Sequence, residues 1–292
     1  MKKLNFPPFS YSELVKEICE LAGLEEKEVE EMVWKEALNP GINVKEEALN
    51  FGIDFHIYNE KMEKFYKESV SFIIECSVEF CRPGKQEVLR KIKSRIENYL
   101  RRNPFNKKNL LMFGDGTGFD TVYLYKFFKD YINFFYFDVP GSKIFNFAIK
   151  NFEKNRINVK FITEYKNIAN DFFDIIISLE VLEHLPEPIK AIEDFSKFLK
   201  REGIILLTES LGAISPNFPT HLKSSSKYKG KIPFIALKYG LLLTYYSKDI
   251  TLMFRPMEFT KKEKILFKDR VRLLLDKNLL KPLIKEFLRK II

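Results

Sequence analysis

A glycine-rich turn stands where the chain changes from a short apolar run to a helical pattern. The run spans residues 110–113, and the turn that follows it reads Gly114, Asp115, Gly116, Thr117 and Gly118. Glycine has no Cβ, so such positions can adopt φ > 0 and let a ligand lie against the backbone at the amino terminus of a helix. The turn therefore predicts a site for a nucleotide-like ligand.

The spacing of the glycines limits the class of ligand that the turn can bind. A dinucleotide fingerprint would need a glycine at position 119, where this chain has Phe119, and no Gly-Lys-Ser/Thr follows the turn as a triphosphate loop requires. Asp138 stands twenty residues after Gly118, at the end of the next apolar run. A carboxylate at that point can accept hydrogen bonds from both hydroxyls of a ribose, so turn and acid together predict an adenosine site.

Short apolar runs that alternate with helical stretches place these residues on a parallel sheet. The expected strands are Leu110–Phe113, Asn133–Phe137, Val159–Ile162, Asp174–Ser178 and Ile204–Thr208. The expected intervening helices are Asp120–Asp130, Lys143–Asn155 and Ile189–Lys200. Apolar residues at helical spacing between Ser10 and Arg102 predict about four helices before the sheet.

These motifs resemble the class I S-adenosylmethionine-dependent methyltransferases over about residues 105–210. The glycine turn is similar to that family's cofactor loop, and Asp138 stands where its ribose-binding acid stands. The run from Phe173 to Leu185, which contains Glu-Val-Leu-Glu-His, resembles the family's fourth strand and the segment after it. The resemblance implies an α/β fold, a Rossmann-like methyltransferase three-layer sandwich with a helical N-terminal domain and a basic C-terminal extension.

The resemblance also implies a set of cofactor-binding residues for S-adenosylmethionine. These are Gly114, Asp115, Gly116, Thr117, Gly118, Asp138, Glu164, Tyr165, Leu179 and Glu180. Glu164 and Tyr165 follow the third strand, where the family commonly has an acidic and a small residue beside the adenine. The implied reaction is an in-line attack of the acceptor on the methyl carbon, which depends mainly on alignment of the reactants.

The three histidines are the candidates for a general base. His221 follows the fifth strand, where acceptor-binding segments occur on this fold, and is the first candidate; His184 is the second, beside a structural or cofactor-adjacent role. His56 lies between helical segments, where packing or capping is expected. Glu180 and His184 have a metal-like spacing, but with neither HExxH nor a nearby cysteine the sequence predicts no metal site.

Charge is distributed unevenly along the chain. The net charge is +9, whereas residues 211–292 carry 18 basic and 6 acidic side chains, a local excess of +12. Three parts are expected: a helical N-terminal domain (1–103), an S-adenosylmethionine-binding domain (104–210), and an acceptor-side insertion with a basic C-terminal extension (211–292). The basic segment indicates an anionic partner, or a helix whose charges are simply solvated.

The remaining expectations concern location and acceptor. Three cysteines without CxxC spacing, no signal peptide and no transmembrane run predict a cytoplasmic protein. The leading hypothesis is a methyltransferase for a small-molecule acceptor, anionic or sugar-derived. An RNA methyltransferase, a lipid or quinone methyltransferase whose C-terminal helix contacts the membrane surface, and a non-catalytic binding module are the alternatives. The sequence leaves the methylated atom and the oligomeric state open.

Overall fold

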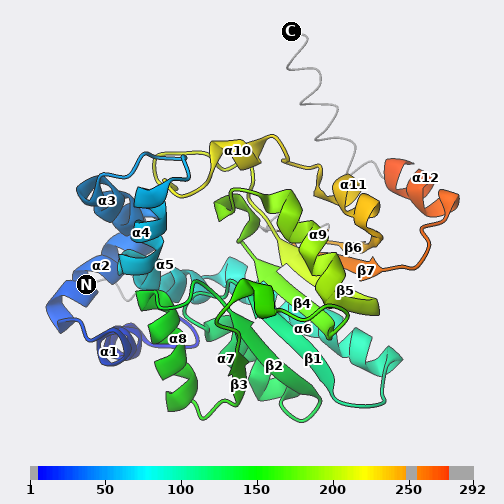
Figure 1. The fold of residues 1–292 in the computed structure, drawn as a ribbon. Helices are drawn as coiled ribbons and strands as arrows, with labels where there is room; N and C mark the ends of the chain where they lie inside the picture. Colours follow the sequence, from blue (N-terminus) through cyan, green and yellow to red (C-terminus); the bar gives the residue numbers. More distant parts are fainter. Residues whose placement is uncertain (1–5, 248–254, 276–292) are drawn as a thin grey trace, which may run out of the picture.

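The computed structural model describes residues 6–247 and 255–275, which form a seven-stranded sheet between layers of helices (Figure 1). The strands are β1 (Lys108–Phe113), β2 (Ile132–Phe137), β3 (Val159–Phe161), β4 (Phe173–Leu179), β5 (Leu199–Thr208), β6 (Leu241–Tyr246) and β7 (Met257–Lys261). Their order is β3-β2-β1-β4-β5-β7-β6. The first five strands are parallel to one another, and β7 is antiparallel to both β5 and β6.

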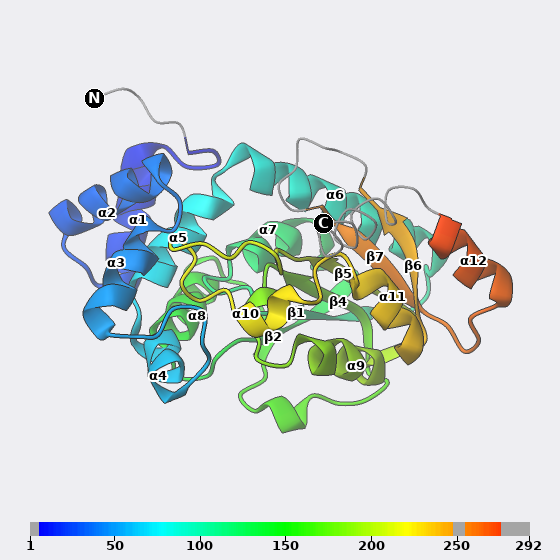
Figure 2. The same ribbon diagram turned by 90° about the horizontal axis from the view of Figure 1, so that it is seen from above.

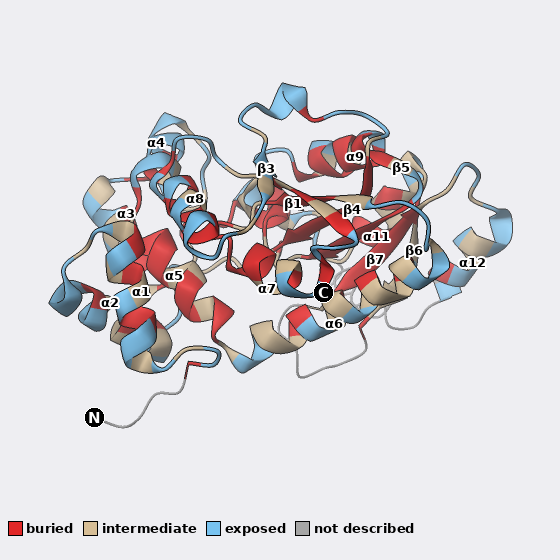
Figure 3. Cartoon of the chain, turned by 90° about the horizontal axis from the view of Figure 1, so that it is seen from below, coloured by how far each residue is buried: buried red, intermediate tan, exposed pale blue. Residues whose placement is uncertain are grey.

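Successive side chains of a β-strand point to opposite faces of the sheet, so each central strand packs into two separate hydrophobic clusters. Leu110 and Met112 of β1 belong to one hydrophobic cluster, and Leu111 and Phe113 to another. The first cluster includes α6 (Pro83–Arg102), α7 (Phe119–Phe128) and α8 (Lys143–Lys154); the second includes α9 (Pro188–Phe198) and α11 (Ile232–Ala236). The predicted three-layer Rossmann-like sandwich is confirmed, and Figures 2 and 3 show the buried sheet between its helices.

The N-terminal region holds more helices than the predicted four. They are α1 (Tyr11–Ala22), α2 (Glu26–Leu38), α3 (Ile42–Phe51), α4 (Glu60–Glu68) and α5 (Ser71–Phe80), followed by α6. Left-handed glycines separate several of them: Gly23 ends α1, Gly41 begins α3 and Gly52 ends it. Helix α6 lies against the sheet, where Arg95 donates two hydrogen bonds to the fully buried Glu258 of β7 at 2.7 and 3.1 Å.

The segment after residue 210 contributes two strands that the sequence did not predict. β7 pairs with β5 along Ile204–Leu207, and β6 extends the sheet beyond β7. Two short helices, α10 (Lys223–Ser226) and α11, precede these strands, and α12 (Phe267–Leu275) lies within the predicted basic tail. The rest of that tail, residues 276–292, lies outside the described residues. No helix in the described part of the chain is long and apolar enough to cross a bilayer.

Glu75 makes stability depend on pH. Burial in α5, with repulsion from Glu36 and Glu79, raises the pKa of Glu75 to about 8. An acid whose folded pKa is raised binds its proton more tightly when folded, so its favourable contribution is present at low pH and is lost as pH rises from about 4.5 to about 8. We therefore expect Glu75→Gln to raise Tm at pH 8.5 and to change it little at pH 5.

Thermal unfolding followed by circular dichroism at both pH values measures this effect. The exposed Glu28→Gln in α2 removes the same charge from a solvated position and is expected to leave Tm unchanged at either pH. A lower Tm for Glu75→Gln at pH 8.5 would show that ionised Glu75 is stabilised by partners.

Candidate active site

The glycine turn and Asp138 meet at the carboxyl ends of β1 and β2. Phe113 and Phe137 are paired in register, so the residues that follow them emerge side by side. The Gly116 N–H donates to Asp138 Oδ2 at 2.8 Å, and the Tyr136 hydroxyl donates to the Gly116 carbonyl at 2.6 Å. The structure thus brings together the two features from which the sequence predicted an adenosine site.

Each glycine of the turn has a conformation that other residues adopt with strain. Their φ angles are 77°, 59° and 77° for Gly114, Gly116 and Gly118. A Cβ at Gly114 would lie 2.6 Å from a methyl carbon of Val181, and one at Gly118 would lie 2.6 Å from the ring of Phe152. Close packing of the protein on itself, together with the left-handed backbone, therefore explains these glycines.

Asp115 and Thr117 hold the turn in place. The Asp115 carboxylate accepts hydrogen bonds from the Thr121 N–H at 2.8 Å and the Thr121 hydroxyl at 2.5 Å, which satisfies donors in the first turn of α7. Burial, followed by repulsion from Asp120, raises the pKa of Asp115. Thr117 is buried, and its carbonyl accepts from the Asn151 side chain at 2.9 Å. Asp115 through its carboxylate and Thr117 through its backbone carbonyl therefore support the loop.

The other predicted cofactor residues occupy different surroundings. Glu164 is exposed and pairs with Lys166 at 2.9 Å. Tyr165 donates to Asp194 at 2.8 Å, while its ring packs on Phe113 and Phe137, next to the turn and Asp138.

Leu179 and Glu180 lie where β4 ends. Leu179 is buried, and Glu180 has a φ of 57° with its N–H donating to the Thr208 hydroxyl at 3.1 Å. Of these four residues, Tyr165, Leu179 and Glu180 lie at the sheet edge that carries the glycine turn, whereas Glu164 points to solvent.

Half-buried carboxyl groups gather at this edge of the sheet. Burial raises the pKa of Asp138 and, with repulsion from Glu183, that of Glu180. Burial and repulsion from Glu183 also raise the pKa of Glu209 to about 7. A raised pKa here means that the ionised carboxylate is poorly solvated, so a cationic ligand that stabilises the ionised form is favoured, and S-adenosylmethionine carries a sulfonium and an ammonium group.

His184 and His221 form one cluster with residues that sequence reasoning missed. Their rings lie 4.8 Å apart, centroid to centroid, at right angles. Tyr66 of α4 places its hydroxyl 3.2 Å from His184 Nδ1, and Glu183 is 1% exposed beside them. No spacing in the sequence links Tyr66 to His184, because 118 residues separate them.

Hydrogen bonds and close packing join the segment that carries His221 to the N-terminal region. The His56 N–H donates to the Pro219 carbonyl at 2.7 Å, and His56 Nδ1 lies 2.9 Å from the His221 carbonyl. Gly41 packs directly against the Asn217 backbone. Residues 211–222 therefore run over the carboxyl edge of the sheet toward α3 and α4, as Figures 1 and 2 show.

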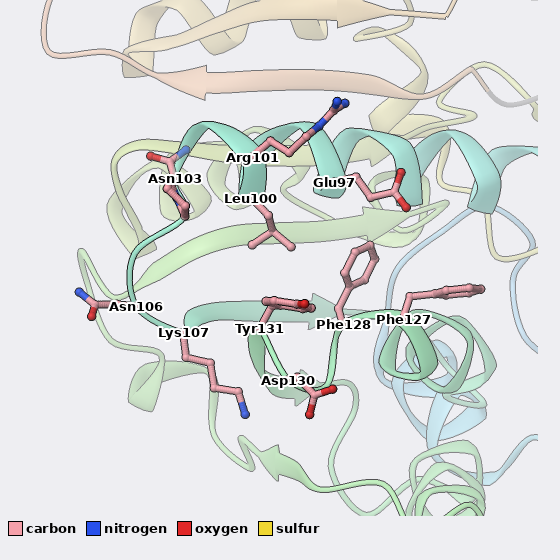
Figure 4. Close-up of a pocket in the computed structure, with 11 residues that line it drawn as sticks. Glu97, Leu100, Arg101, Asn103, Asn106, Lys107, Phe127, Phe128, Asp130 and Tyr131 are labelled. Carbon is pink, nitrogen blue, oxygen red and sulfur yellow. The ribbon is translucent and has the colours of Figure 1, made fainter.

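A hollow of about 820 Å³ lies elsewhere, at the opposite edge of the sheet (Figure 4). Its lining comes from the end of α6 and from the loops before β1 and β2, including Leu100, Lys107 and Tyr131. None of the predicted cofactor residues lines it. Because ligands of open α/β sheets bind at the carboxyl ends of the strands, this hollow is separate from the cofactor site.

Comparison with known structures agrees with the fold. The carbon methyltransferase CurJ superposes with a TM-score of 0.52 at 13% identity, over 65% of this chain and 58% of that one. This chain thus spans less than two thirds of the CurJ structure. A proposed sarcosine dimethylglycine methyltransferase from Galdieria sulphuraria superposes with a TM-score of 0.50 at 13% identity, over 76% of this chain and 99% of that one. No curated protein matches the chain.

Family comparison assigns the chain more directly. The model of a methyltransferase domain matches residues 85–260, which include most of α6, the glycine turn, Asp138, β1 to β6 and all of β7 except Lys261. The predicted enzyme class and its cofactor, S-adenosylmethionine, are thereby confirmed. The chain belongs to the methyltransferase domain family, as a class I S-adenosylmethionine-dependent methyltransferase.

Proposed function

We propose that this methyltransferase acts on a compact, hydroxyl-bearing small molecule, anionic or sugar-derived. The observation that carries the proposal is the cover over the carboxyl edge of the sheet. Residues 211–222 cross this edge and are hydrogen-bonded to His56 and Tyr66 of the N-terminal region. An acceptor that reaches the methyl group must fit beneath this cover, which favours a small molecule over a folded macromolecule.

Polar groups beneath the cover suit a hydroxyl acceptor. Glu180 and Glu183 present buried carboxylate oxygens, and His184 and His221 present ring nitrogens. Burial, with a smaller contribution from His184, lowers the pKa of His221 to about 3. A group with so low a pKa is a weak general base near neutral pH, so we propose that His221 binds and orients rather than removes a proton.

We propose that cofactor binding uses Asp138 and the glycine turn, with Tyr165, Leu179 and Glu180 along the same edge. Asp138 supplies the ribose contact, and the turn supplies the backbone surface for the remainder of the cofactor. Asp115 and Thr117 act through the shape of the turn. Glu164 is exposed, and we propose no direct contact for it.

The acceptor class is tested by measuring release of S-adenosylhomocysteine with panels of sugars, phosphorylated sugars and short RNAs. Turnover with at least one small molecule, at a rate above that with RNA, is the expected result. Transfer to RNA with no turnover of small molecules would refute the proposal while leaving the cofactor assignment intact.

A second candidate, methylation of RNA, is favoured by the charge of residues 211–292. Their excess of +12 could follow a phosphate backbone, and such binding weakens steeply as salt concentration rises. Filter binding of RNA at 50 and 200 mM salt distinguishes the candidates. An RNA affinity that falls by roughly 10³-fold between these salt concentrations supports methylation of RNA, and no binding at 50 mM salt rejects it.

A further inference from the structure

Three side chains at the acceptor end are arranged like the ligands of a metal ion. Glu183 and His184 lie in the turn Leu182–His184 after β4, and His221 comes from the segment that covers them. One potential ligand atom from each lies within 4.8 Å of the others. In a tetrahedral shell, ligands about 2.0–2.2 Å from the ion lie about 3.3–3.6 Å from one another, so side-chain movements of up to about 1.5 Å would bring the three atoms to coordination distance.

The carboxylates in this cluster lack the partners that buried charges require. Glu183 Oε1 accepts from the Ser210 hydroxyl at 2.5 Å, but Glu183 Oε2 has no hydrogen-bond partner among the described residues. Both carboxylate oxygens of Glu180 are likewise buried without a partner in that part of the chain. An isolated buried carboxylate is strongly unfavourable unless it is paired or coordinates a metal. Two such groups next to each other are a favourable place for a cation.

The hydrogen bonds of the histidines leave one ring nitrogen of each free to coordinate. His221 Nδ1 lies 2.9 Å from the Ala213 carbonyl, which can only accept, so Nδ1 carries the proton. The Tyr66 hydroxyl lies 3.4 Å from the Thr220 carbonyl and 3.2 Å from His184 Nδ1. When the hydroxyl donates to the carbonyl, its oxygen accepts from a protonated Nδ1, and in that tautomer His184 Nε2, like His221 Nε2, has a lone pair. Metal-binding histidines typically show this arrangement, with the other ring nitrogen donating to a carbonyl or polar group.

We propose that Glu183, His184 and His221 bind a divalent transition-metal ion, with Glu180 as an additional carboxylate beside it. Imidazole nitrogens combined with carboxylate oxygens suit Zn²⁺, Fe²⁺, Co²⁺ or Mn²⁺ better than Mg²⁺, which prefers oxygen ligands. This inference deepens the proposed function and rests on it for the role of the ion. Coordination positions left open by the protein would receive hydroxyl oxygens of the acceptor, which favours an acceptor with two adjacent hydroxyls.

Direct ion binding tests the site without any methyl transfer. Full-length protein, freed of tag and stripped with a chelator, is dialysed against Mn²⁺ or Zn²⁺, and bound metal is measured by mass spectrometry. The expected result is one ion per chain for the wild type and roughly 100-fold or greater loss of affinity for Glu183→Gln and for His221→Ala. Glu187→Gln is the matched control, because Glu187 is an exposed acid four residues from Glu183 and is expected to bind as the wild type does.

Tyr66→Phe is a milder variant that keeps the ring and removes only the hydroxyl beside His184. We expect it to weaken metal binding about 10-fold to 100-fold, as loss of a hydrogen bond to a ligand typically does. Circular dichroism verifies that each variant is folded. The proposal is overturned if folded wild-type protein binds no stoichiometric ion, or if Glu183→Gln and His221→Ala bind as tightly as the wild type.

The outcomes for the metal and for the acceptor can be separated. Stoichiometric metal binding without turnover of any small molecule would sustain the site and reject the proposed acceptor class. Turnover of a small molecule by chelated, metal-free protein at the wild-type rate would sustain the acceptor class and reject the role of the ion.

Discussion

Replacing Asp138 with alanine is expected to weaken binding of S-adenosylmethionine by about 10-fold to 100-fold. Its half-buried carboxylate lies at the end of β2, next to the glycine turn, where it accepts hydrogen bonds from the Gly116 and Val139 N–H groups. Lone pairs that remain on both oxygens can accept the two ribose hydroxyls. Hydrogen bonds to a charged group contribute roughly 1.5–3 kcal/mol, which corresponds to the expected loss.

Isothermal titration with S-adenosylmethionine and S-adenosylhomocysteine measures this change, with NAD as a comparison ligand. Asp130→Ala removes an exposed acid in the loop before β2 and is expected to bind as the wild type does. Because Asp138 also holds the Gly116 N–H, Asp138→Ala must be shown to remain folded by circular dichroism. Unchanged affinity in a folded variant, or tighter binding of NAD than of S-adenosylmethionine, would contradict the placement of the ribose at Asp138.

The central fold was predictable because its signals are local. Each parallel strand is a short buried run, and all seven residues of β4 are buried. The glycine turn and Asp138 could also be predicted to be neighbours. Parallel strands in register end at the same edge of the sheet, which places the loop after β1 beside the acid after β2. The resemblance to a known family added the predicted reaction and cofactor, which neither burial nor spacing specifies.

β7 escaped prediction because one of its partners, β5, is distant in the chain, and β6 joins the sheet only through β7. β7 inserts between β5 and β6, so its hydrogen bonds are made about fifty residues away from β5. Its Glu258 is fully buried, a position that a polar residue rarely suggests from sequence, and Arg95 of α6 compensates it. A buried acid whose partner lies 163 residues away leaves no local pattern.

Only part of the cluster at the acceptor end could be predicted, because here too some of the partners are distant in the chain. The run that ends in Glu183 and His184 was recognised, and His221 was singled out by its position after the fifth strand. What the sequence could not show is that His221 folds back onto His184, and that Tyr66 of α4 reaches the same point. Near Glu183 and His184 the sequence offers no further ligand in a metal-binding motif, whereas the fold brings His221 to them.

Gly118→Ala is expected to lower the free energy of unfolding by about 3 kcal/mol. Its φ of 77° is left-handed, which costs an ordinary residue roughly 1–2 kcal/mol, and its Cβ would lie 2.6 Å from the Phe152 ring, where overpacking costs roughly 1–3 kcal/mol. Gly141→Ala provides the matched control. Gly141 has a φ of 76° but nothing within 4 Å of its Cβ position, so it should lose only about 1 kcal/mol.

Urea unfolding of the two variants therefore separates backbone strain from packing. A loss for Gly118→Ala that clearly exceeds that for Gly141→Ala shows that Phe152 presses α8 against the glycine turn and fixes its shape. Because we propose that Asp115 and Thr117 act on the cofactor through that shape, weaker S-adenosylmethionine binding should accompany the loss for Gly118→Ala and be absent for Gly141→Ala. Equal losses for both variants would mean that Phe152 yields readily, and that the turn depends on its backbone conformation alone.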